Sequence, residues 1–187
     1  YTANLAARLV TNSTAQQIEA VRALVHRAIL SRDITVDELS RLIRPVVGLY
    51  RGQVTANFNY YTAQKKRLLE MNPTMRLSTA EERAKEASIK FAEKQHRYRA
   101  MMIARTELAF GYNIGEFNAV HQAKNSGMIG EVVKKWTTSG DDRVCDYCRA
   151  LQGKTAPLDE TFPGTSVDLP PLHPNCRCGV QYIEIRR

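Results

Sequence analysis

The residues of this sequence best suited to chemistry are two pairs of cysteines with a histidine between them. The first pair is Cys145-Asp-Tyr-Cys148 and the second is Cys176-Arg-Cys178, which follows His173. A CxxC at a helix start brings two sulfurs to one point, and a CxC in extended chain turns both side chains to one face because strand side chains alternate with a period of two. This spacing predicts a zinc site.

The four cysteines are the favoured ligands, and His173 is expected to substitute for one of them or to support them from outside. A tetrahedral site filled by protein ligands has no open position, so the zinc would be structural. Arg143, Arg149 and Arg177 are placed in sequence to offset the negative charge of the thiolates. Two alternatives stay open: disulfide bonds, against which the absence of any secretion signal argues, and reduced thiols without metal.

Basic residues are concentrated in the first half of the chain. The sequence has 187 residues, 27 Lys and Arg against 19 Asp and Glu, and a net charge of +8 that arises entirely from residues 1–100. Contact with a polyanion such as DNA is one interpretation. The other is an ordinary solvated helix face, because Glu81/Lys85, Glu86/Lys90 and Glu93/Arg97 have i,i+4 spacing. The candidate DNA contacts are Lys65, Lys66, Arg67, Arg76, Lys90 and Lys94.

A second polar group, Arg105-Thr-Glu107, falls where a long predicted helix becomes apolar on two sides. Charged groups in such a place must be paired, so we expect Arg105 and Glu107 to form structural ion pairs, with Arg105 reaching Asp141, Asp142 or the end of the C-terminal unit. No phosphate-binding glycine loop, GxSxG or HExxH motif is present. His26, His96 and His121 stand alone at helical positions and are expected to be satisfied surface or rim residues rather than bases.

Four helices are expected in the first two-thirds of the chain. Capping boxes beginning at Ser13 and Thr35 predict a helix ending near Leu30 and a short helix stopped by Pro45. A third helix of about 26 residues is expected between Val47 and Asn72, and a fourth from a cap at Ser78 to Lys124, ~69 Å long. Gly111 and Gly115 could bend it or admit another backbone closely.

Beyond Gly127 the pattern changes to strands at 131–138 and 179–185, which can pair with each other. A short helix capped by Asp141 or Asp142 and ended by Gly153 should lie between them, and Trp136 should fill the core. We therefore predict an α+β fold with an elongated helical part, residues 1–125, and a small β-hairpin subdomain, residues 126–187, stapled by the Cys/His cluster because such a hairpin has little core of its own. No stretch is long and apolar enough to span a bilayer. Tyr1 is interpreted neither as a gene start nor as the start of a signal peptide.

Taken in order, several short motifs resemble the phage head morphogenesis, or Mu F-like, minor head protein family of tailed bacteriophages. They are Ile103-Ala-Arg-Thr-Glu107, Lys135-Trp-Thr-Thr138, Asp141-Asp-Arg-Val-Cys-Asp-Tyr-Cys148, Leu151-Gln-Gly153, Phe162 and Pro170-Pro-Leu-His-Pro-Asn-Cys-Arg-Cys178. Each alone is weak, but their order over residues 100–180 is specific. Over residues 1–99 only the helical character and the helix start at Thr35 are similar.

The resemblance implies a non-enzymatic virion protein inside the head near the portal vertex, and in the host cytoplasm during assembly. Expected partners are the portal protein, the major capsid or scaffold protein and packaged double-stranded DNA, with a role in head morphogenesis and in DNA packaging or ejection. Some members carry toxin or other enzymatic domains behind this one, and we expect none after Arg187. The resemblance also lends weight to Cys145, Cys148, His173, Cys176 and Cys178 as a unit, although some relatives have fewer of these cysteines.

Two other functions remain as alternatives. One is a zinc-stapled HNH-like nuclease in which His173 is the base and Asn175 orients it. That chemistry needs a further histidine or carboxylate for a divalent metal, and the C-terminal unit has no second histidine. The other is a stand-alone zinc DNA-binding protein, whose affinity would depend on base sequence.

Overall fold

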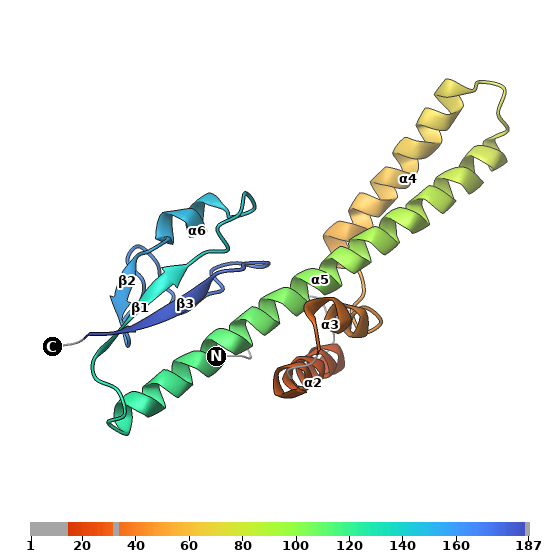
Figure 1. The fold of residues 1–187 in the computed structure, drawn as a ribbon. Coiled ribbons are helices and arrows are strands. Elements are labelled where there is room, and N and C mark those ends of the chain that lie inside the picture. The colour runs from red at the N-terminus through yellow and green to blue at the C-terminus, as the bar shows by residue number, and fades with distance from the viewer. Residues whose placement is uncertain (1–14, 32–33, 186–187) are drawn as a thin grey trace.

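The computed structural model describes residues 15–31 and 34–185, and one long helix organises all of them (Figure 1). Helix α5, Leu77–Asn125, has 49 residues, which corresponds to ~73 Å. It contacts α2, α3, α4 and strand β3. Helix α4 lies along its first half, α2 and α3 against its middle, and the sheet beside its second half. The molecule is elongated, as the helix lengths predicted.

The first helices form a small core against the middle of α5. Helix α2 spans Ala15–Ser31 and α3 spans Val36–Ile43. Thr35 and Glu38 form the predicted capping box, and α3 ends two residues before Pro45. The Ser13 of the other predicted box lies outside the described residues. The buried side chains of this core are Val21, Val25, Ala28, Leu39, Ile43, Val47, Ala100, Ile103, Ala104 and Leu108.

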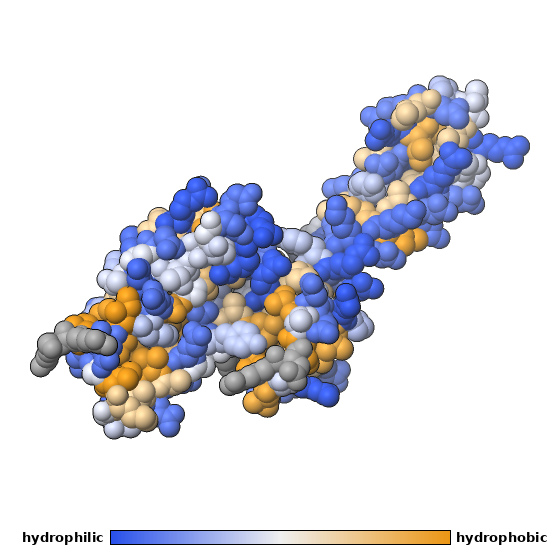
Figure 2. Space-filling view, in the orientation of Figure 1, coloured by the Kyte–Doolittle hydropathy of each residue, from blue (hydrophilic) through white to orange (hydrophobic). Residues whose placement is uncertain are grey.

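Helix α4, Arg51–Met71, starts later than the sequence predicted. Residues 47–50 have no regular secondary structure, because Val47 is buried in the core with residues of α2, α3 and α5 and Tyr50 then serves as the N-cap of α4. We call α4 together with residues 77–99 of α5 the helical arm. Its contacts include stacked rings of Tyr60 and Phe91, 4.5 Å apart, and a hydrogen bond from Ser88 Oγ to Asn57 Oδ1. Figure 2 shows the arm covered mostly by hydrophilic residues.

The structure differs from the sequence-based expectations for α5 at its first residue and at its glycines. The helix begins at Leu77 with Arg76 as its N-cap and without a side-chain cap, so Ser78 lies inside the first turn. The helix is also unbroken at its glycines. Gly111 admits Ile29 of α2: a Cβ added there would lie 2.3 Å from Ile29 Cδ1. At Gly115 no atom lies within 4 Å of such a Cβ.

The C-terminal part is a three-stranded antiparallel sheet with the order β2-β1-β3. Strands β1, Val132–Thr137, and β3, Gly179–Glu184, pair as the sequence predicted, with Lys134 opposite Tyr182. Strand β2, Thr155–Pro157, was missed, because it has three residues and ends in a proline, which is found in sheets chiefly at edges. Among the described helices none is both long and apolar enough to cross a membrane.

The sheet and α6, Asp146–Leu151, enclose a second core that includes cysteines. Trp136 is fully buried, as expected, and meets Phe162 edge to face at 5.0 Å between ring centroids. Around this pair lie Cys148, Leu151, Ala156, Cys176 and Cys178. The mostly helical fold with a small sheet and a Cys/His cluster confirms the predicted fold class.

Candidate metal centre

The first cysteine pair is positioned by the start of α6. Cys145, and not Asp141 or Asp142 as expected, is the N-cap of this helix, and its Sγ accepts a hydrogen bond from the backbone N–H of Cys148 at 3.5 Å. One helical turn therefore brings both sulfurs to the same side, which is what a CxxC at a helix start does. Asp141 instead closes the preceding loop by accepting from the backbone N–H of Arg143.

The second pair lies in the extended segment that leads into β3. Cys176 and Cys178 are buried in the second core, whereas Arg177 between them reaches the other way, to Asp141. This is the period of two that the CxC spacing predicted. Asn175, directly before the pair, has a φ of 64°, a left-handed conformation that asparagine tolerates better than most residues.

His173 lies between the sulfurs of the first pair. Its Nε2 is 3.1 Å from Cys145 Sγ and 3.2 Å from Cys148 Sγ. Its Nδ1 is 2.8 Å from the carbonyl oxygen of Pro174, and since a carbonyl only accepts, Nδ1 donates. In a neutral imidazole the lone pair is then on Nε2, facing the sulfurs. Metal-bound histidines commonly orient their ring with such a second hydrogen bond.

The five donors form two groups of three that share one cysteine. Cys145, Cys148 and His173 form the first, Cys148, Cys176 and Cys178 the second, and within each group all donor atoms lie within 4.8 Å. The Sγ atoms of Cys148 and Cys176 are 3.7 Å apart. A tetrahedral zinc ion with Zn–S bonds of ~2.3 Å requires ~3.8 Å between sulfurs. The distances are those of side chains that can share a metal ion.

No disulfide joins these cysteines, all of which lie in the described part of the chain. The 3.7 Å between Cys148 and Cys176 is far beyond the ~2.05 Å of an S–S bond. The disulfide alternative therefore has no support in this geometry.

The sulfurs differ in acidity because their surroundings differ. A hydrogen bond from Cys178 is the main cause that lowers the pKa of Cys176 to about 5, against burial, which raises it. Burial and the nearby charge of Cys176 raise the pKa of Cys148 to about 12, and the hydrogen bond to Cys176 together with burial raises that of Cys178 further. It is unfavourable for several thiols this close together to ionise, because the resulting thiolates repel one another. A bound cation would offset that repulsion.

Two of the three arginines near the cluster donate hydrogen bonds to the carboxylate of Asp141. Arg177 donates two hydrogen bonds to the carboxylate of Asp141, at 2.5 and 2.7 Å, and Arg143 donates a third at 3.1 Å. These bonds, that of Arg177 first, hold the pKa of Asp141 well below its usual range. Arg149 donates to the carbonyl of Val144. The charge of Cys178 still contributes to a raised pKa of Arg177, after the contacts with Asp141.

The ion pairs expected for Arg105 and Glu107 are not the ones found. Arg105 Nη1 donates to Oδ1 of Asn175 at 2.6 Å rather than to Asp141 or Asp142, because Asp141 is taken by Arg177 and Arg143. Asp142 acts on Arg177 only through its charge. Glu107 is 7% exposed, its Oε1 has no hydrogen-bond partner, and burial raises its pKa to about 7.

The residue between them, Thr106, makes a structural contact that the sequence did not single out. Its hydroxyl accepts a hydrogen bond from the backbone N–H of Asn175 at 2.7 Å. Together with Arg105 it fixes the segment that carries Cys176 and Cys178 onto α5. Only its place inside the Arg105-Thr-Glu107 motif could have suggested this role.

Lys134 of β1 was also missed. It is fully buried, its Nζ has no hydrogen-bond partner, and the ring centroids of Phe117 and Phe162 lie 5.6 and 5.4 Å from Nζ. Burial lowers its pKa. From the sequence, a lysine in a strand of alternating pattern is expected to face solvent. The sequence therefore does not predict a buried ammonium close to two aromatic rings.

The candidate DNA contacts lie on the helical arm or, for Arg76, directly before its second helix, away from the cysteines. Lys65 pairs with Glu81 across the arm at 3.5 Å, and Lys66 with Glu70 along α4 at 3.8 Å. Arg67, Arg76, Lys90 and Lys94 are exposed. Of the three helix histidines, His96 bonds the carbonyl of Val47, His121 lies 2.9 Å from Asp159, and His26 is exposed on α2.

Comparison with known proteins agrees with this architecture. No curated protein and no solved structure matches the chain. The model of one family, described as Phage Mu protein F like protein, matches residues 19–181. That span covers all four cysteines, His173 and the whole of α5, and it confirms the resemblance seen in the short motifs. Such membership indicates a part in phage head morphogenesis and association with the virion, and the chain thus belongs to the Phage Mu protein F like family.

Proposed function

We propose that the protein is a minor head protein that acts inside the head of a tailed phage, near the portal vertex, and that it binds rather than catalyses. The observation that carries this proposal is α5, a helix of 49 residues with the helical arm at one end and the cysteine-bearing unit at the other. Two surfaces held ~70 Å apart on a rigid rod suit a protein that links partners. The partners proposed are the portal protein and the major capsid or scaffold protein.

The surroundings of the cluster favour a structural role. A groove beside it is lined by Tyr147, Lys154, Thr165 and Ser166, together with Cys145 and His173, and no carboxylate from the described part of the chain lines it. An HNH-like nuclease needs His173 free to act as a base with Asn175 orienting it. Here Nδ1 of His173 is bonded to Pro174, Nε2 faces two sulfurs, and Asn175 accepts from Arg105. This supports a non-catalytic protein.

Zinc is the metal we propose for the cluster. The donors are thiolates and an imidazole with the second hydrogen bond typical of a ligand, which suits zinc rather than calcium or magnesium. Cys148 would be common to any choice of four donors because it belongs to both groups. Zinc held there would tie the start of α6 to the segment before β3 and so stabilise a unit with a small core.

Packaged double-stranded DNA is a further proposed partner, through the helical arm. Residues 51–99 contain eleven basic and five acidic side chains. The basic residues are spread over α4, the turn and α5 and are not gathered in a groove-reading element, which favours contact with phosphates over base recognition. This supports a virion role over the stand-alone zinc DNA-binding protein. DNA packaging and ejection are the steps in which such contacts would act.

The test is co-purification with portal rings of the same phage, during assembly in host cytoplasm and from finished heads. The protein is expected to remain with the rings after nuclease treatment, which separates portal binding from bridging by DNA. Cross-linking should place it on the inner side of the vertex. Recovery only with empty shells, or loss from the rings once DNA is digested, would contradict the portal contact.

A further inference from the structure

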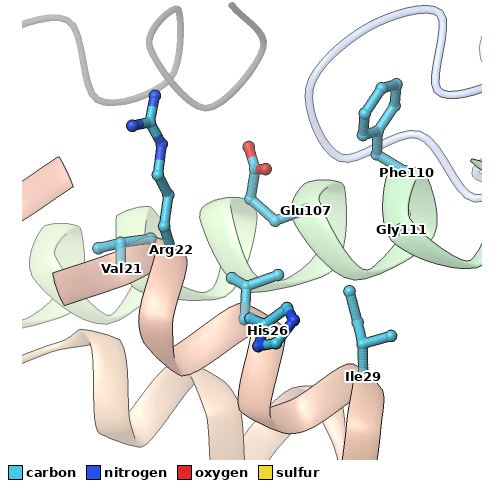
Figure 3. Close-up of a pocket in the computed structure, with 8 residues that line it drawn as sticks. Val21, Arg22, His26, Ile29, Glu107, Phe110 and Gly111 are labelled. Carbon is cyan, nitrogen blue, oxygen red and sulfur yellow. The ribbon is translucent and has the colours of Figure 1, made fainter. Parts of the chain in front are cut away.

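A cavity of about 230 Å³ opens between α2 and α5, outside the cluster described above (Figure 3). Its walls are mostly apolar and include Val21 and Val25 of α2 and Phe110 of α5. The ionisable residues that line it are Arg22, His26 and Glu107. Cavities of ~150 Å³ with similar walls hold benzene. This one is therefore large enough for a long side chain.

Glu107 brings a carboxylate to this apolar space. Its Oε1 is buried and has no hydrogen-bond partner. Arg22, which also lines the cavity, acts on Glu107 through its charge, but the effect of burial on the pKa is larger. The guanidinium of Arg22 lies 3.6 Å from Glu19. A buried acceptor without a donor is costly, so a ligand that brings a donor gains more than one that does not.

The space depends on Gly111. Because a Cβ at this position would lie 2.3 Å from Ile29 Cδ1, any other residue must displace the end of Ile29. Ile29 itself lines the cavity, so displacing its end changes the shape of the cavity. Replacing the glycine therefore alters the cavity without altering charge.

We propose that this cavity is a socket for a lysine or arginine side chain of a partner protein, with Glu107 Oε1 accepting a hydrogen bond from its cationic end. The methylene stem of such a residue packs well on apolar walls while its head seeks an acceptor. A purely apolar group would leave Oε1 unsatisfied. The choice of a protein partner rests on the proposed assembly function, whereas the preference for a cation rests on the cavity alone.

Three small probes test that preference. n-Butylammonium and n-propylguanidinium reproduce the side chains of lysine and arginine, and n-butanol has the same stem with a neutral end. Titrations are followed by NMR at the amides of Val21, Val25 and Gly111. We expect saturable shifts with both cations, and binding of n-butanol about tenfold weaker, because its hydroxyl can donate to Oε1 but carries no positive charge to strengthen that hydrogen bond. Equal binding of all three probes, or no saturable binding, would overturn the proposal.

Two variants separate charge from space. Glu107→Gln keeps the shape and should abolish the preference for cations over n-butanol, while Gly111→Ala should weaken all three probes. Thermal unfolding confirms that each variant is folded. In assembled heads, Glu107→Gln should lower the number of copies incorporated, with Glu116→Gln, an exposed glutamate of α5, as the control. Unchanged cation preference in Glu107→Gln would refute the socket, and unchanged incorporation would refute the protein partner; portal binding is tested separately.

Discussion

Arg105 of α5 donates a hydrogen bond from Nη1 to Oδ1 of Asn175, 2.6 Å away, although 70 residues separate them in the chain. Asn175 directly precedes Cys176. Its backbone N–H also donates to Thr106, the neighbour of Arg105. The segment that presents the second cysteine pair is thereby held by two consecutive residues of the long helix. The cluster and the helical body are coupled at this point.

We predict that Arg105 and Asn175 are energetically coupled. Asn175→Gly removes Oδ1 but keeps the backbone N–H and tolerates the φ of 64°, and Arg105→Met keeps much of the stem. A double-mutant cycle from urea unfolding should give an interaction of about 1–2 kcal/mol, since a hydrogen bond to a charged group is lost. Strictly additive effects would show that the contact contributes nothing to stability.

The second prediction concerns metal content. Purified protein should contain about one zinc per chain, and Cys148→Ser should lose it, because Cys148 belongs to both groups of donors. Tyr147→Phe, an exposed neighbour between the two cysteines, is the matched control and should retain zinc. The spectrum of the cobalt-substituted protein should change with His173→Ala only if the imidazole is a ligand.

Loss of zinc should act on one part of the molecule more than the other. Chelation or Cys148→Ser should expose residues 130–185 to protease while α2, α3 and the helical arm stay protected, since the core of these helices contains no cysteine. A folded, zinc-free protein with the same protease pattern would remove the structural role of the metal. Equal loss of protection in both parts would refute the division into residues 1–125 and 126–187.

The sequence predicted features that depend on local patterns. The capping box at Thr35 and Glu38 follows from spacing alone, as does the placement of Cys176 and Cys178 on one face with Arg177 on the other. Where a contact joins distant segments, local rules fail. Nothing near Arg105 in sequence indicates that Arg177 takes Asp141 and leaves Asn175 as the acceptor. Likewise the burial of Lys134 depends on rings contributed by α5 and by the loop at Phe162.

Glu107 should make stability fall as pH rises. Burial raises its pKa in the folded chain from 4.5 to about 7, so the folded state holds the proton more tightly than the unfolded state. Between about pH 4.5 and 7 the folded form binds more protons, and raising the pH through this window destabilises it. Glu107→Gln should remove the effect and raise the free energy of unfolding at pH 8 by on the order of 2–3 kcal/mol.

Urea unfolding at several pH values between 4 and 8 tests this, with Glu116→Gln as an exposed control on the same helix. The difference in stability between Glu107→Gln and the unchanged protein should grow with pH and level off above about pH 7. A constant difference, or one that is largest in acid, would mean that the carboxylate finds a partner in solution and that its burial is not costly.

The last prediction concerns DNA and the helical arm. Reversing Lys65, Lys66 and Arg67 to glutamate should weaken binding to any duplex DNA and flatten the dependence of affinity on salt, because each lost phosphate contact lowers the logarithmic slope by about 0.9. Reversing Arg27, Arg41 and Arg44, exposed residues of α2, α3 and the turn after it, changes the net charge equally and is the control. Electrophoretic mobility shifts at several salt concentrations, with two unrelated sequences, provide the measurement. If both triple variants lose the same affinity for DNA, net charge alone explains the binding. If neither variant loses affinity, DNA does not bind to the helical arm.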